Sequence, residues 1–132
     1  MKTQRLVLPF IFCISLASCA ILASCALFDT IKPTVEIDSP NNNSSYPTGK
    51  RKIRGKASDN VGVKSVEVRI DDSDFSQASG DEEWEYVYTF RSVSSYRITV
   101  RALDMSGNYG YTSITIKTFM PSNSSGDHAP VK

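Results

Sequence analysis

The sequence predicts an all-β protein, a seven-stranded antiparallel β-sandwich that follows an N-terminal signal segment. Two observations lead to this prediction. Between residues 33 and 119, apolar and polar residues alternate in short runs, which is the period of half-buried strands. Clusters rich in Gly, Pro, Asn, Asp and Ser separate these runs, and no stretch between them shows a convincing helical period.

Six runs show the alternation clearly. In the first run, Val35 and Ile37 alternate with Glu36 and Asp38. A short seventh strand is expected near residues 75–78. Two sheets can bury about a dozen large apolar side chains between them, at ~1.5–3 kcal/mol each. The core positions of the other five runs are Ile53, Gly55 and Ala57; Val66, Val68 and Ile70; Trp84, Tyr86, Tyr88 and Phe90; Tyr96, Ile98, Val100 and Ala102; and Ile114 and Ile116.

The aromatic run from Trp84 to Phe90 has two interpretations. Its four rings share one parity and therefore lie on one face of a strand. Such a row could stack on sugar rings, but aromatic side chains also commonly fill sandwich cores. We expect this face to be the core, with Trp84 buried.

Composition excludes several classes of protein. The chain has 132 residues, enough for one domain, with 15 basic and 14 acidic side chains. This balance gives no reason to expect a nucleic-acid partner. All three cysteines lie within residues 1–25, which excludes a disulfide scaffold or a cysteine zinc site in the folded part. The single histidine, His128, makes a catalytic triad improbable, so we expect no enzymatic activity.

Residues 1–25 have the layout of a secretory signal. Residues 1–5 carry two positive charges, and residues 6–22 are almost wholly apolar. A membrane-spanning helix over residues 6–28 is one alternative, since this stretch could just cross a hydrocarbon core of about 30 Å. A plainly cleaved signal is another. Two strings argue against both, because Leu16-Ala17-Ser18-Cys19 and Leu22-Ala23-Ser24-Cys25 each resemble the lipobox of bacterial lipoproteins.

The lipobox resemblance implies that one cysteine becomes diacylglyceryl-modified and, after cleavage, N-terminal. Cys25 is the predicted site and Cys19 the alternative, because cleavage before Cys19 would leave the apolar stretch 20–27 on the mature protein. The lipid would anchor the protein to a membrane of the bacterial cell envelope, the outer rather than the inner one in a cell with two. The predicted divisions are a signal peptide at 1–24, a lipidated tether at 25–32, a sandwich domain at 33–119 and a disordered tail at 120–132.

The sandwich region resembles bacterial immunoglobulin-like (Ig-like) domains. Residues 57–63 and 66–71 are similar to the B–C region of these domains, and Trp84, residues 96–104 and residues 106–108 to their later strands and F–G turn. The resemblance implies a seven-stranded sandwich of a kind found in bacterial surface proteins, adhesins and accessory regions of secreted glycosidases. It implies no single activity. Such domains often occur in tandem or beside a catalytic module, whereas only one copy is present here.

Two groups of acidic and amide side chains are candidate cation ligands. Asp59, Asn60, Asp104 and Asn108 could bind a cation together if their loops converge. The favoured interpretation is turn chemistry, in which these side chains accept backbone hydrogen bonds and Gly107 is left-handed. Seven acids between positions 71 and 85 lack EF-hand spacing and are expected to form a solvated segment. We therefore predict no cofactor besides the covalent lipid, with calcium as the less favoured alternative.

Exposed basic and aromatic side chains are the remaining candidates for binding. Residues 50–56 carry five positive charges. They could bind an anionic polymer or a lipid headgroup, but we expect them to face solvent beside Glu36, Asp38 and Glu85. Tyr109 and Tyr111, near the last turn, are better placed than the aromatic run for external contact.

The predicted function is a lipid-anchored, non-enzymatic module that presents a binding or interaction surface in the cell envelope. The alternative is a carbohydrate-binding accessory lipoprotein that uses exposed aromatic side chains. The predicted partners are the membrane, reached through the lipid, and an envelope protein or polysaccharide.

Overall fold

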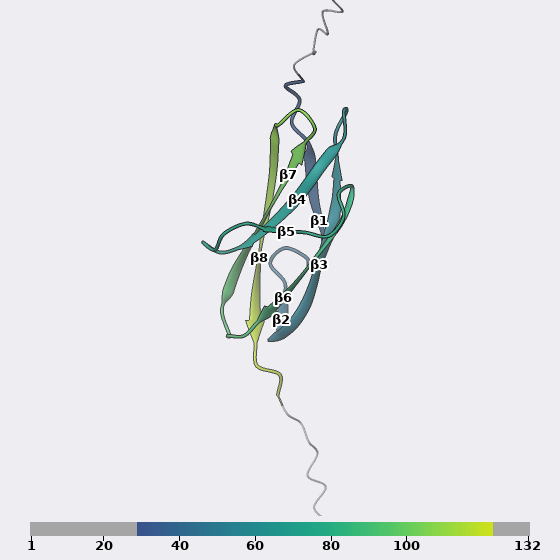
Figure 1. Cartoon of the computed structure of the whole chain (residues 1–132). Coiled ribbons are helices and arrows are strands. Elements are labelled where there is room, and N and C mark those ends of the chain that lie inside the picture. Colours follow the sequence, from purple (N-terminus) through teal and green to yellow (C-terminus); the bar gives the residue numbers. More distant parts are fainter. Residues whose placement is uncertain (1–28, 123–132) are drawn as a thin grey trace, which may run out of the picture.

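The computed structural model describes residues 29–122 as two packed β-sheets (Figure 1). The predicted signal peptide and both candidate lipidation sites, Cys19 and Cys25, lie outside this range. The described residues form no helix, so none of their elements is a long apolar helix of the kind that crosses a bilayer. Their strands are β1 (Thr34–Ser39), β2 (Ser45–Pro47), β3 (Gly49–Ser58), β4 (Val63–Ile70), β5 (Ser76–Gln77), β6 (Glu83–Phe90), β7 (Ser95–Asp104) and β8 (Tyr109–Phe119).

The strand order confirms the predicted sandwich. One sheet has the order β1-β3-β6 and the other β2-β8-β7-β4-β5. All pairs are antiparallel except β2 with β8, which run parallel. The short strand expected near residues 75–78 is β5. The strand β2 was not predicted, because a three-residue strand is too short to show an alternating period.

The core lies between the two sheets and contains most of the predicted inward positions, together with Val63 and Ala78. Of the predicted positions, Ile37, Tyr86, Tyr88, Tyr96 and Ile114 are only partly buried. Ile53, Ile98 and Ile116 are fully buried, and Phe90 is almost so. Tyr88 and Tyr96 are half-buried and meet Phe90 edge-on, with ring centroids 4.8 and 4.9 Å from it. The buried apolar set comprises Val35, Ile53, Ala57, Val63, Val66, Val68, Ile70, Ala78, Trp84, Phe90, Ile98, Val100, Ala102 and Ile116.

Trp84 occupies space that a glycine on the neighbouring strand leaves open. It pairs with Gly55 in the β3–β6 register and is 2% exposed, as expected for a core residue. A Cβ atom at position 55 would overlap the carbonyl oxygen of Glu36 and lie 2.7 Å from indole atom Cζ2. Gly55 therefore permits the close approach of β1, β3 and the indole.

We predict that Trp84→Ala destabilises the protein strongly. Removing a buried Trp typically costs ~3–5 kcal/mol, a large part of a total stability of ~5–15 kcal/mol. Chemical denaturation followed by circular dichroism measures the change. Tyr111→Ala is the control, because Tyr111 is 59% exposed and its loss should cost well under ~1 kcal/mol. Red-shifted, easily quenched Trp84 fluorescence, in a protein that tolerates the Ala change, would contradict the core assignment.

Candidate functional site

Three segments of the chain meet at one end of the sandwich (Figure 1). They are residues 29–33, which lead into β1, the loop between β3 and β4, and the end of β7 with the loop that follows it. Each segment contributes one aspartate, namely Asp29, Asp59 and Asp104. We call these three side chains the aspartate cluster.

Asp59 shapes the loop between β3 and β4. Its Oδ2 atom accepts hydrogen bonds from the backbone amides of Val61 at 2.9 Å and Gly62 at 3.2 Å. This is the turn chemistry that the sequence favoured. The other oxygen, Oδ1, is shielded from solvent and has no hydrogen-bond donor among residues 29–122.

Asp104 ends β7 and is completely buried. Its Oδ1 accepts hydrogen bonds from the backbone amides of Ser106 and Asn108, both at 2.8 Å, and Oδ2 accepts one from the Asn108 amide group at 2.8 Å. Gly107 between them has a φ of 96°, the left-handed conformation that was predicted. Burial alone would raise the pKa of Asp104, but the hydrogen bonds from Asn108, Ser106 and Gly107 outweigh it and lower the pKa below its usual value.

Asp29 comes from the segment that precedes β1. Its Oδ1 accepts a hydrogen bond from the backbone amide of Ile31 at 3.0 Å. Its Oδ2, like Oδ1 of Asp59, is shielded from solvent and has no donor among the described residues. Asn108 Nδ2 also donates to the backbone carbonyl oxygens of Asp29, at 2.8 Å, and Ile31, at 3.3 Å. The Asn108 side chain thus ties the N-terminal segment to the loop between β7 and β8.

The aspartate cluster concentrates negative charge in a small volume. One carboxylate oxygen from each of the three side chains lies within 4.8 Å of the other two. The ion pairs among residues 29–122 are Lys52–Glu85 and Arg101–Glu67, so neither compensates the cluster. Carboxylate oxygens are the ligands that hard divalent cations such as Ca²⁺ and Mg²⁺ take in proteins.

The structure brings together three of the four loop residues chosen from the sequence. Asp59, Asp104 and Asn108 lie at this end of the sandwich, whereas Asn60 is exposed beside them. Sequence reasoning missed Asp29, which it assigned to the tether. No local motif could have found it, because Asp29 reaches the other two carboxylates only through the tertiary fold.

The seven acidic residues between positions 71 and 85 are all exposed, as expected. Asp71 accepts a hydrogen bond from the backbone amide of Arg97 at 2.7 Å. Glu85 pairs with Lys52 at 2.7 Å, which is one of the cross-strand partnerships expected for the basic strand. Both side chains are about half exposed, so this pair contributes little stability.

Arginine side chains cover part of the aromatic surface beside β8. The guanidinium of Arg101 lies 4.0 Å from the ring centroid of Phe75 and 4.7 Å from that of Tyr109. Arg101 Nε donates to Glu67 at 2.6 Å, and this hydrogen bond is the main cause that raises the pKa of Arg101. The rings of Tyr109 and Tyr111 are 6.1 Å apart. Tyr109 is half-buried, so the 59% exposed Tyr111 is the more open of the two candidate sugar-stacking rings.

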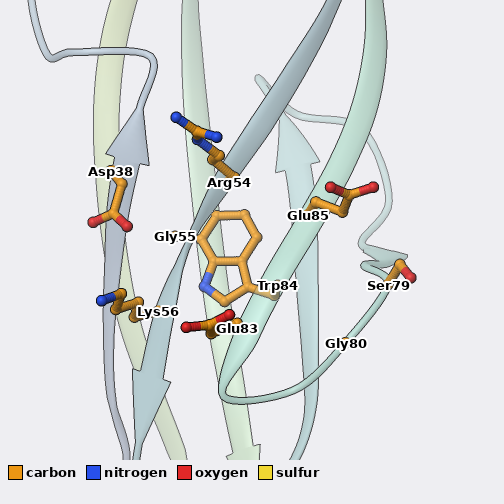
Figure 2. Close-up of a pocket in the computed structure, with 9 residues that line it drawn as sticks. All are labelled: Asp38, Arg54, Gly55, Lys56, Ser79, Gly80, Glu83, Trp84 and Glu85. Atoms are coloured by element: carbon orange, nitrogen blue, oxygen red, sulfur yellow. The ribbon is translucent and has the colours of Figure 1, made fainter.

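An open hollow lies over the sheet that contains β1, β3 and β6 (Figure 2). Figure 2 shows Trp84 in the middle of the view, with charged side chains of both signs around it. The indole Nε1 is shielded from solvent and has no acceptor among the described residues. The lining residues are three acids, two cations, one serine, Trp84 and two glycines. They are Asp38, Arg54, Gly55, Lys56, Ser79, Gly80, Glu83, Trp84 and Glu85.

The two sheets define an Ig-like β-sandwich, and comparison with known proteins gives its family. The family model described as Bacterial Ig domain (Big_7) matches residues 33–100. The chain therefore belongs to the bacterial Ig domain family. No curated protein sequence matches the chain.

Solved structures with a similar fold include modules of larger proteins. The fibronectin(III)-like modules of Clostridium thermocellum CbhA align with a TM-score of 0.57 and 19% identity, over 64% of this chain and 94% of theirs. The PKD1 domain of Vibrio anguillarum Epp aligns with a TM-score of 0.54 and 13% identity, over 70% of this chain and 100% of that domain. An engineered protein aligns with a TM-score of 0.56 and 20% identity, over 67% of this chain, which spans only 20% of its length. At these identities the likeness concerns the fold alone.

We predict that Asn108→Ala loosens this end of the sandwich. The substitution removes the donor to Asp104 Oδ2 and to the carbonyl oxygens of Asp29 and Ile31. Leaving partly buried acceptors unpaired costs roughly 1–3 kcal/mol, which denaturant titration can measure. Asn60→Ala, a change at an exposed loop residue, is the control and should stay within about 0.5 kcal/mol of the natural protein. Equal effects of the two substitutions would show that Asn108 does not hold the segments together.

Proposed function

We propose that this protein is a lipid-anchored, non-enzymatic Ig-like module that presents an interaction surface in the bacterial cell envelope. The observation that carries the proposal is the position of the folded domain relative to the lipobox strings. Only residues 26–28 separate Cys25 from Asp29, the first described residue of the aspartate cluster. A lipid on Cys25 would therefore hold the end of the sandwich that bears the cluster close to the membrane.

The path of the chain supports an interaction surface at the end of the sandwich opposite the aspartate cluster. The N-terminal segment enters the sandwich at one end, and β8 finishes at the other (Figure 1). Thr118, near the end of β8, bonds to the loop between β6 and β7 through the backbone of Ser92 and Ser94. Exposed apolar side chains, Val93 and Met120, lie in or beside these segments. A lipid on Cys25 would leave this end directed away from the membrane.

The family supports an interaction role rather than catalysis. Ig-like domains typically bind or space other parts of a protein assembly and carry no fixed activity. The composition agrees, because the single histidine lies in the tail at position 128.

Carbohydrate binding is the second candidate function. It is favoured by the exposure of Tyr111 and by the neighbouring ring of Tyr109. It is weakened by the guanidinium of Arg101, which already lies over the ring of Tyr109. A sugar would therefore stack mainly on Tyr111.

We predict that the mature protein begins at Cys25 and carries acyl chains there. Mass spectrometry of the N-terminal peptide of protein isolated from membranes should show the acylated cysteine. Cys25→Ser should abolish acylation and processing, whereas the matched change Cys19→Ser should leave both intact. Acylation of Cys19 would move the site, and an uncleaved, unmodified Met1 would refute the lipoprotein assignment.

The carbohydrate alternative predicts selective, tyrosine-dependent binding on a glycan array. Reproducible binding that is lost in Tyr111→Ala but retained in Val93→Ala would support it, because Val93 lies in the separate loop between β6 and β7. Absence of binding to bacterial and plant polysaccharides would leave the protein-interaction role as the better account.

A further inference from the structure

We propose that the aspartate cluster is a calcium site that fastens the N-terminal tether to the sandwich. The carboxylates of Asp29, Asp59 and Asp104 come from three separate segments, and one oxygen of each lies within 4.8 Å of the others. Two of these side chains have an oxygen, Oδ2 of Asp29 and Oδ1 of Asp59, that is shielded from solvent and has no donor among residues 29–122. Buried carboxylate oxygens normally have a partner, so a cation is the missing component.

In Asp29 and Asp59, hydrogen bonds to one carboxylate oxygen hold the other, unpartnered oxygen in place. Asp29 Oδ1 accepts from Ile31, and Asp59 Oδ2 accepts from Val61 and Gly62. These bonds fix the orientation of the side chains, which leaves the remaining oxygen of each available to a ligand. Asp104 is fully buried and is oriented by three hydrogen bonds of its own. The donors are therefore arranged before a cation arrives.

The donor chemistry and spacing select calcium. The cluster offers only oxygen and contains no His or Cys, which excludes the donors that zinc prefers. Oxygens that share one Ca²⁺ at about 2.3–2.6 Å can lie up to roughly 5 Å apart, so carboxylate oxygens that all lie within 4.8 Å of one another can share one ion. Mg²⁺ requires shorter bonds and a near-regular octahedron, which three carboxylates on independent loops satisfy less readily.

The position of Asp29 gives the site a consequence for the whole molecule. Asp59 lies in the loop between β3 and β4 and Asp104 ends β7, whereas Asp29 precedes the first strand. A cation shared by all three would join the tether to both loops. In the lipid-anchored form, calcium would then fix the orientation of the domain relative to the membrane. This consequence rests on the proposed function.

Isothermal titration calorimetry and thermal melting of the full chain in detergent, with CaCl₂ added after chelation, test the site. Calcium should bind and raise the melting temperature. Asp29→Asn and Asp59→Asn can keep the turn hydrogen bonds, because an amide oxygen replaces the accepting carboxylate oxygen, but they remove one charge each. Each substitution should weaken calcium binding at least tenfold, yet raise the melting temperature in chelator because it relieves repulsion within the cluster. The matched control is Asp74→Asn, an exposed acid outside the cluster, which should change neither quantity.

Hydrogen exchange reports on the tether. Calcium should slow exchange in a peptide covering residues 29–33 of the natural protein but not of Asp59→Asn. Failure of calcium to bind at millimolar concentration would overturn the site, and an equal response to MgCl₂ would overturn the choice of metal. Full calcium affinity in Asp29→Asn would overturn the link to the tether. None of these measurements depends on acylation. A negative result would therefore overturn the calcium site without contradicting the proposed lipid anchor.

Discussion

The apolar layer between the two sheets is the constraint on which the other features of residues 29–122 depend. Its side chains come from alternate positions of β1, β3, β4, β6, β7 and β8, so burying them fixes the register of every long strand at once. The fit is tight where Trp84 approaches Gly55, since no Cβ atom can be accommodated there without displacing β1. With the register fixed, the strand ends and the loops that follow them have little freedom of position.

The aspartate cluster is a product of that register. β3 ends just before Asp59, and β7 ends at Asp104, at the same end of the sandwich in different sheets. Packing the sheets brings these strand ends together, and the N-terminal segment runs beside β8, where Gly110 lies directly against the carbonyl group of Pro33. Hydrophobic burial therefore brings three like charges together, an arrangement that is unfavourable unless something else binds there.

Much of the fold was predictable because each long strand carries its own alternating pattern. Ile98 and Val100 could be assigned to the core from parity, and Trp84 from parity together with the common use of aromatic side chains in sandwich cores. The turn roles of Asp59 and Asp104 could be assigned from local Asx chemistry. The strand β2 and the participation of Asp29 were not predictable, since both depend on contacts between segments far apart in the chain. Asn108 was a candidate because of its place in a turn. Its hydrogen bonds to Asp29 and Ile31 span more than 75 residues, so no local sequence pattern could predict them.

The Asn108 side chain also determines how the molecule carries mechanical load. A pull on the chain ahead of Asp29 reaches the bonds between Asn108 and the carbonyl groups of Asp29 and Ile31 before it reaches the ladder between β1 and β3. Those bonds direct tension into the turn between β7 and β8, and so into the larger sheet. The strand β1 lies at an edge of the smaller sheet and pairs along one side only, with β3. A force applied at the N-terminus would therefore have to break the hydrogen bonds of Asn108 before it separated β1 from β3.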